Sequence, residues 1–161
     1  MPRPRTAQAT PVVPPARLDT AVPILRIRSL DESIAHYIGV LGFKLDWKDE
    51  ACIACVSRDQ CRLMLCEGDQ GHAGGWVWIG TGDVRRLHAE LVARGARIRQ
   101  QPTNHPWACE LQVEDPDGNV IRFGSPSIAG EAFGPWLDMN GRLWERAACG
   151  GWACMDSGVP E

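Results

Sequence analysis

The sequence has no hydrophobic run near the roughly 18 residues that a membrane-spanning helix needs. Its first 20 residues contain five prolines and three arginines, but no apolar segment of the kind found in secretory signals. Because proline interrupts helices and strands, residues 1–20 are predicted to form a flexible arm. These absences predict a cytoplasmic protein without a membrane partner.

An excess of basic residues is also missing. The formal net charge is −3, from 17 lysines and arginines against 20 aspartates and glutamates. Nucleic-acid binding requires a clustered basic surface, so we expect no nucleic-acid partner. Mild acidity suits a cationic small molecule, although it is also ordinary for a soluble protein.

The cysteines do not form a regular metal or disulfide pattern. Their number is odd and no export signal is visible, which favours free thiols in a reducing compartment. Cys52 and Cys55 have the spacing of a redox or zinc motif, but positions three apart on a predicted strand face opposite sides. A zinc site that added Cys149 and Cys154 would have irregular spacing. The seven cysteines are Cys52, Cys55, Cys61, Cys66, Cys109, Cys149 and Cys154.

Hydrophobic residues make up 44% of the chain, which is enough to build a folded core. Residues 21–29 are predicted to form a strand. Ser29 then has the character of a helix N-cap, with Glu32 three positions later, and Gly42 is placed to end that helix. Strands are predicted at residues 43–47, 52–57 and 62–66. The first half therefore has the order β-α-β-β-β.

The same order restarts after a glycine-containing linker at residues 68–75. A strand at 76–79 precedes a helix that Asp83 caps and Gly95 ends, and strands follow at 97–100, 109–113 and 120–123. Four pairs of positions match at a spacing of 53: Ile34 with Leu87, Ile38 with Leu91, Gly42 with Gly95, and Leu45 with Ile98. Such a repeat implies that neither half buries its sheet alone.

We therefore predict an α+β fold in which two β-α-β-β-β modules, residues 21–67 and 75–124, form one domain. Their mixed sheet is expected to fold into a concave cleft, and that cleft is the obvious ligand site.

Three stretches carry a family resemblance: AVPILRIRSLDESIAHYIGVLGFKLDW, GWVWIGTGDVRRLHAELVARG and HPWACELQVEDPDGNVIRFG. They resemble the signature stretches of the glyoxalase/bleomycin-resistance/dioxygenase superfamily, also called the vicinal-oxygen-chelate superfamily, over residues 21–124. The closer resemblance is to the bleomycin-resistance subgroup, through AVPIL, LGF, GWVW and HPW. That resemblance implies a homodimer that binds a cationic drug in clefts at the dimer interface.

The enzymes of this superfamily hold a divalent metal through histidine, glutamine or glutamate. The matching positions here are Val22, Met64, Trp76 and Arg122. None is a good ligand for a hard metal, and an arginine repels a cation. We therefore expect no metal, no other cofactor and no catalytic residue, while a displaced metal site remains an alternative.

The resemblance also implies a set of ligand-binding residues. Trp47, Trp76 and Trp107 fall where the subgroup places stacking aromatic side chains, which suits tryptophan's large flat surface. Cys66 falls at a small polar lining position, and Cys52 replaces an aromatic residue. Met64 and Arg122 complete the set from the former metal positions. Tryptophan is also common in cores, and Arg122 has two readings: it binds an anionic group, or it pairs with a buried acid such as Glu110.

The leading hypothesis is therefore metal-independent sequestration of a small cationic or aromatic antibiotic of the bleomycin type, without chemical change. One alternative is a glyoxalase-like lyase or dioxygenase with an unorthodox metal site, and the other is a binder of an unidentified metabolite. Cys66 is a conceivable nucleophile, but no base is positioned for it in the sequence.

Residues 125–161 form a tryptophan- and glycine-rich extension outside the resemblance. Its large apolar residues would be costly if exposed, so we expect them to cover a sheet face or a partner subunit. Residues 138–141 read as a turn between two short extended pieces. The extension acts either as a structural cover or as a lid over the cleft, and the structural role is favoured.

Overall fold

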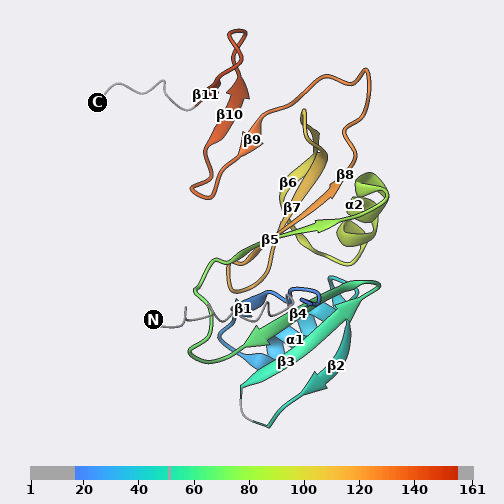
Figure 1. Ribbon diagram of the computed structural model, residues 1–161, viewed down its shortest axis with the longest axis vertical. Coiled ribbons are helices and arrows are strands. Elements are labelled where there is room, and N and C mark those ends of the chain that lie inside the picture. Colours follow the sequence, from blue (N-terminus) through green and yellow to red (C-terminus); the bar gives the residue numbers. More distant parts are fainter. Residues whose placement is uncertain (1–16, 51, 156–161) are drawn as a thin grey trace, which may run out of the picture.

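The computed structural model describes residues 17–50 and 52–155, so most of the expected N-terminal arm lies outside the described residues. The chain is built from two modules and an extension that follow one another along the long axis (Figure 1). None of the described helices is long and apolar enough to cross a membrane.

The N-terminal module has the predicted order of elements. It comprises β1 (Ile24–Arg26), α1 (Leu30–Gly39), β2 (Lys44–Lys48), β3 (Ile53–Arg58) and β4 (Cys61–Cys66). Its sheet has the order β1-β4-β3-β2, in which β1 runs parallel to β4 and the other neighbours are antiparallel.

The C-terminal module repeats this plan. It comprises β5 (Trp76–Gly80), α2 (Val84–Ala93), β6 (Arg97–Asn104), β7 (Cys109–Glu114) and β8 (Val120–Ser125). The sheet order is β5-β8-β7-β6, and β5 again runs parallel to the last strand of its module. The α+β fold of two repeated modules with mixed sheets is thus confirmed.

The two helices begin as their sequences predict. The Ser29 side chain accepts a hydrogen bond from the Glu32 backbone at 3.4 Å, and Asp83 accepts from Arg85 and Arg86 at 3.0 Å. Gly95 follows the second helix with φ +79°, a conformation that glycine adopts without strain.

The predicted repeat spacing of 53 is wrong within the helices. The buried positions correspond at a spacing of 54, namely Leu30 with Val84, Ser33 with Leu87, and Tyr37 with Leu91. Ile38, which was matched to buried Leu91, is 39% exposed. The spacing returns to 53 at Gly42 and Gly95, both of which have positive φ, because two residues separate the first helix from its glycine and only one separates the second.

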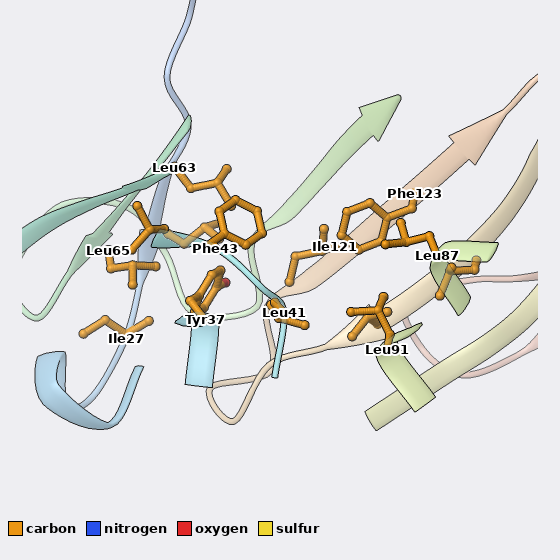
Figure 2. Packing of buried hydrophobic residues seen from close by; sticks show 14 of the residues in the cluster. Ile27, Tyr37, Leu41, Phe43, Leu63, Leu65, Leu87, Leu91, Ile121 and Phe123 are labelled. Carbon is orange, nitrogen blue, oxygen red and sulfur yellow. The ribbon is translucent and has the colours of Figure 1, made fainter. Parts of the chain in front are cut away.

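A single apolar core joins the modules. Figure 2 shows that Tyr37 and Phe43 of the first module pack beside Leu41. On the other side of Leu41 lie Ile121 and Phe123 of the second module. Each helix packs on one face of its own sheet, and the two covered faces meet in this cluster.

The turn between β7 and β8 fastens the second module to the first. Buried Asp115 accepts hydrogen bonds from the Tyr37 hydroxyl at 3.0 Å and from the backbone and side chain of Asn119, both at 2.8 Å. Asn119 also donates to the Arg26 carbonyl in β1 at 2.9 Å. Burial, and then the Asp115 charge, raise the pKa of Tyr37 well above its usual value of 10.0.

Some element boundaries differ from the prediction. β1 is only three residues long, whereas residues 21–29 were predicted, and β6 is longer than the predicted 97–100. Irregular pairing between β6 and β7 lets β6 continue to Asn104. Bulges of this kind leave no clear alternation in the sequence.

The extension forms a third sheet of the strands β9 (Trp136–Leu137), β10 (Leu143–Arg146) and β11 (Trp152–Cys154). The predicted turn lies between β9 and β10, with Gly141 at φ +80°. The third strand was not predicted. Figure 1 shows this sheet beside the C-terminal module, at the end of the molecule away from the N-terminal module.

Candidate ligand-binding site

The open face of the C-terminal sheet is the face turned away from α2. Along β7, Leu111 and Val113 enter the core, so the alternate residues Glu110 and Gln112 point to the open face. Both are nevertheless buried, with 3% and 1% of their surface exposed. A second layer of protein therefore covers this face.

The covering layer is the extension, which is hydrogen-bonded to β6 and β7. Gln112 donates to the Leu137 carbonyl at 2.9 Å, and Gln100 donates to the Pro135 carbonyl at 2.7 Å. Arg99 donates to the Asp138 carbonyl at 2.5 Å. The extension is thus hydrogen-bonded to the sheet through three backbone carbonyls, at residues 135, 137 and 138.

Within the extension, Asp138 organises the turn between β9 and β10. Its carboxylate accepts a hydrogen bond from the Trp144 indole at 3.0 Å and from the backbone of Asn140 and Arg142. The Trp144 hydrogen bond is the main cause that lowers the pKa of Asp138, and the two backbone donors lower it further.

An ion pair lies at the centre of the covered face. Arg122 of β8 pairs with Glu110, and the Trp78 indole donates to the other Glu110 oxygen at 2.8 Å. Of the two readings of Arg122, the structure therefore shows the pairing with the buried acid. Trp78 of β5 is paired with Arg122 of β8. Trp76 lies two residues before Trp78 and therefore on the same face of the sheet. The Arg99 guanidinium stacks over Trp76 at 5.1 Å.

A cavity of about 510 Å³ lies between this sheet and the extension. Its lining residues are Trp107, Arg122, Trp136, Trp144 and Trp152. We call it the tryptophan cavity. Trp107 comes from the loop between β6 and β7, and its ring lies 5.6 Å from that of Trp152. The cavity thus combines four indoles with one guanidinium.

His105 supports Trp107 from behind. Its ring stacks on Trp107 with a centroid distance of 4.8 Å and an interplanar angle of 7°. Burial is the main cause that lowers the pKa of His105, so the ring is neutral near pH 7. Neither ring nitrogen of His105 makes a hydrogen bond of normal geometry. The Gly134 backbone lies nearby and partly offsets the lowering of the His105 pKa.

A second hollow, of about 470 Å³, is also lined by Trp107. Trp78 and Gly124 contribute to its lining. A Cβ atom at Gly124 would come within 2.6 Å of the Trp78 ring, so the absence of a side chain there lets the indole lie flat on β8.

The seven residues predicted to bind ligand divide between the two sheets. Trp76, Trp107 and Arg122 come together on the C-terminal sheet, and Trp107 and Arg122 line the tryptophan cavity. Trp47, Cys52, Met64 and Cys66 lie on the N-terminal sheet or at its edge. Within one chain these two groups do not share a cavity of the described residues.

The N-terminal group of predicted ligand-binding residues includes two thiols, those of Cys52 and Cys66. Cys66 is fully buried, and its thiol interacts with that of Cys52. Partial desolvation is the main cause that raises the pKa of Cys52, and Cys66 and Asp49 raise it further. Because the thiolate is the nucleophile, a raised pKa makes Cys52 a poor one.

The metal positions of the superfamily carry no suitable donor set here. In the described part of the chain, no three histidine, cysteine, aspartate or glutamate residues are placed together to hold a metal ion. Arg122 stands at one of those positions and already neutralises Glu110.

Four residues of this site were not predicted: Trp78, Trp136, Trp144 and Trp152. Trp78 lies two residues after Trp76 on the same strand, and it is 52% exposed. The other three lie in the extension, which was favoured as a structural cover. Their density in a segment outside the family resemblance was the available signal.

Comparison with known proteins gives the family. The sequence profile of the Glyoxalase/Bleomycin resistance protein/Dioxygenase superfamily matches residues 17–123. The chain therefore belongs to this superfamily. No curated protein is significantly similar to the chain in sequence.

Several solved structures share the fold. The bleomycin-binding protein from bleomycin-producing Streptomyces verticillus, solved with copper(II)-bleomycin, has 24% identity and a TM-score of 0.59, and the match covers 70% of this chain and 99% of that protein. TnmS3, an antibiotic-binding protein from Streptomyces sp. CB03234, has 24% identity and a TM-score of 0.58, with coverage of 70% and 100%. TioX from Micromonospora sp. ML1 has 21% identity and a TM-score of 0.58, with coverage of 66% and 98%.

These identities establish the fold alone. The matches account for nearly the whole of each neighbour but at most 70% of this chain, and the superfamily profile ends at residue 123. About 30% of this chain therefore has no counterpart in these three structures.

Proposed function

We propose that the protein sequesters a small aromatic or cationic compound of the bleomycin type, without metal and without chemical change. The observation that carries this proposal is the tryptophan cavity, in which four indoles surround one ion-paired arginine. Its volume of about 510 Å³ suits a small molecule, since such sites measure roughly 300–1,000 Å³.

The chemistry of the lining supports binding rather than catalysis. Tryptophan offers a large flat contact area and loses little rotamer entropy when a ring stacks on it. Glu110 is buried and already engaged by Arg122 and Trp78, so it is not free to act as a base. Antibiotic-binding proteins among the structures of the same fold support the same class of function.

The proposal includes a homodimer in the cytoplasm. On the N-terminal sheet, Ile24 and Trp47 are 38% and 44% exposed, beside partly exposed Met64. Exposed apolar surface of this kind is typical of an interface, and two-fold pairing is the commonest arrangement. A second copy placed against this sheet would bring Trp47, Cys52 and Met64 toward its partner's C-terminal sheet, where Trp76, Trp107 and Arg122 lie, whereas Cys66 is fully buried and would not reach a ligand.

The first test is a titration of the purified chain, after metal analysis, with metal-free bleomycin. Tryptophan fluorescence and calorimetry would follow binding, and sedimentation would give the oligomeric state. Saturable binding near one ligand per chain in metal-free protein is expected. A stoichiometric divalent metal combined with no bleomycin binding would instead favour the lyase or dioxygenase alternative.

A further inference from the structure

The tryptophan cavity is built within one chain. Its floor, Arg122, comes from β8, one wall comes from the β6–β7 loop, and Trp136, Trp144 and Trp152 come from the extension. The extension is held on β6 and β7 by hydrogen bonds from Gln100, Gln112 and Arg99. No partner subunit is needed to enclose this space.

We infer that the tryptophan cavity binds a planar aromatic ring system that carries an uncharged or anionic hydrogen-bond acceptor, with the C-terminal extension as part of the binding site. This inference rests on the proposed function, because it names the ligand class for the same sheet. It also assigns a binding role to the extension, which lies outside the matched superfamily profile.

Shape favours a planar ring. The side chains that line the cavity are four indoles and one guanidinium, all of them flat groups. The Trp107 and Trp152 rings already lie 5.6 Å apart at an interplanar angle of 57°, a tilted contact that a third ring can extend. Offset and edge-to-face contacts among aromatic rings are favourable in both arrangements.

Trp107 is held in place for such a contact. His105 stacks on one of its faces at 4.8 Å, and His105 itself is only 1% exposed. Trp107 is 49% exposed, so its outer face is accessible to a ligand. A wall that is supported on one side and open on the other resembles a preorganised stacking platform.

Charge selects the polar group of the ligand. Arginine and tryptophan side chains donate hydrogen bonds and do not accept them, so every polar side-chain group of the lining is a donor. Among the described residues, the Arg122 guanidinium has one hydrogen-bond acceptor, Glu110, so most of its five N–H groups have no protein acceptor. A carbonyl, phenolate or carboxylate therefore matches the cavity.

An organic cation is disfavoured by the arrangement of the ion pair. The Glu110 side chain is 4% exposed, whereas that of Arg122 is 23% exposed. The positive partner thus faces the cavity and the negative partner lies behind it. Tryptophan faces attract cations, but here the one charged group that lines the cavity repels them.

The test uses three anthracenes whose substituents at position 9 are anionic, neutral and cationic: anthracene-9-carboxylate, anthracene-9-methanol and 9-(trimethylammoniomethyl)anthracene. Calorimetry with the full chain should give one site per chain, with an affinity that does not change when the protein is diluted. The Kd of the carboxylate and that of the alcohol should each be about tenfold or more lower than the Kd of the cation.

Trp152→Ala tests the role of the extension. It should weaken binding of the carboxylate and the alcohol about tenfold or more. Phe133→Ala is the matched control, because Phe133 is an exposed aromatic residue of the same extension and does not line the cavity. It should leave all three affinities unchanged. Thermal melting of both variants would show that they remain folded.

Arg122→Gln tests the charge argument. It leaves the Glu110 carboxylate without its cationic partner, so the order of affinities should reverse in favour of the cation. The double variant Glu110→Gln/Arg122→Gln removes both charges and should bind the carboxylate and the cation about equally. The double variant also keeps the test valid if the single variant fails to fold.

Three results would overturn the inference: tighter binding of the cation by the unaltered chain, no binding of any anthracene, or full affinity in Trp152→Ala. Bleomycin separates this failure from that of the proposed function. If bleomycin binds and the anthracenes do not, the ligand class is wrong while sequestration stands. If the anthracenes bind in the expected order and bleomycin does not, the inference stands and the bleomycin-type ligand is wrong.

Discussion

The two modules share one backbone plan but carry different chemistry at the same place in their sheets. In the C-terminal sheet, Arg122 lies between Trp78 and Gln112 on neighbouring strands. These side chains point to the open face, where the extension covers Gln112 and lines a cavity with Arg122, while Trp78 is 52% exposed.

The corresponding place in the N-terminal sheet is apolar. Met64 lies there between Ile24 and Cys55. Every residue of the edge strand β2 is exposed, whereas only two of the eight residues of its counterpart β6 are exposed. The comparison teaches that a duplicated sheet is constrained on its core face, where both modules keep aliphatic residues, while its open face is free to diverge.

The largest expected effect on stability concerns the two turns that connect the last two strands of each module, β3 to β4 and β7 to β8. Asp115→Ala should lower the free energy of unfolding by about 3 kcal/mol or more, because it removes a buried acceptor and leaves buried donors unpaired. Those donors include the Tyr37 hydroxyl and the Asn119 side chain. Urea unfolding followed by tryptophan fluorescence measures the loss.

Asp59→Ala is the matched control in the N-terminal module. Asp59 is exposed in the turn between β3 and β4 and has φ +51°. Alanine there should cost about 1 kcal/mol or less, the usual penalty for a left-handed position. Equal losses in the two variants would contradict the conclusion that the Asp115 turn holds the second module on the first.

The next effect concerns the matched sheet positions. Arg122→Met gives the C-terminal sheet the residue that the N-terminal sheet has at Met64. It should cost about 2–3 kcal/mol, toward the low end for breaking a buried ion pair because Arg122 is partly exposed. The double variant Glu110→Gln/Arg122→Met should recover most of the loss, since no unpaired charge remains. A single variant as stable as the unaltered chain would show that the ion pair is dispensable.

The core faces of both modules could be predicted because local rules govern them. Helix caps at Ser29 and Asp83 act over two or three residues, and the alternation of apolar residues marks each strand. The helical repeat spacing was wrong by one residue, since Ile34 and Ile38 are apolar neighbours of the positions that are buried. Periodicity alone does not show which of two adjacent helix faces is buried when both carry apolar residues.

The site was predictable only where the family resemblance reaches. Trp107 and Arg122 lie within that stretch, and both line the tryptophan cavity. Trp144 and Trp152 enter it from the extension, through contacts such as Gln112 to the Leu137 carbonyl that join distant segments. No local pattern encodes such contacts, so the sequence indicated that the extension covers something without showing what it encloses.

A pH titration sharpens the comparison of the two helices. Tyr37 of α1 occupies the place of Leu91 in α2, and it is the only tyrosine in the chain. Its pKa in the folded protein is raised, chiefly by burial, above the unfolded value near 10. The folded state therefore binds more protons than the unfolded state above about pH 10, and its stability falls as the pH rises there.

Tyrosinate absorbance at 295 nm should consequently appear only as the protein unfolds. Tyr37→Phe should lose about 1–2 kcal/mol near pH 7, because the Asp115 hydrogen bond is lost, and should show a smaller further decline above pH 10. The difference between the two proteins isolates Tyr37 from lysine titration in the same range. Tyrosinate that forms near pH 10 in a protein that remains folded would show that Tyr37 is accessible to solvent.

The smallest effect compares two partly exposed tryptophans, one on each sheet. Trp78 and Trp47 are 52% and 44% exposed, but only the Trp78 indole has a hydrogen bond to a buried carboxylate, that of Glu110. Trp78→Phe should therefore cost about 1.5 kcal/mol, the lower end for a hydrogen bond to a charged group, and Trp47→Phe about 0.5 kcal/mol or less. Urea unfolding at several protein concentrations measures both. A larger loss for Trp47→Phe, growing with protein concentration, would show that a second copy covers the N-terminal sheet, and it would place the interface of the proposed homodimer there.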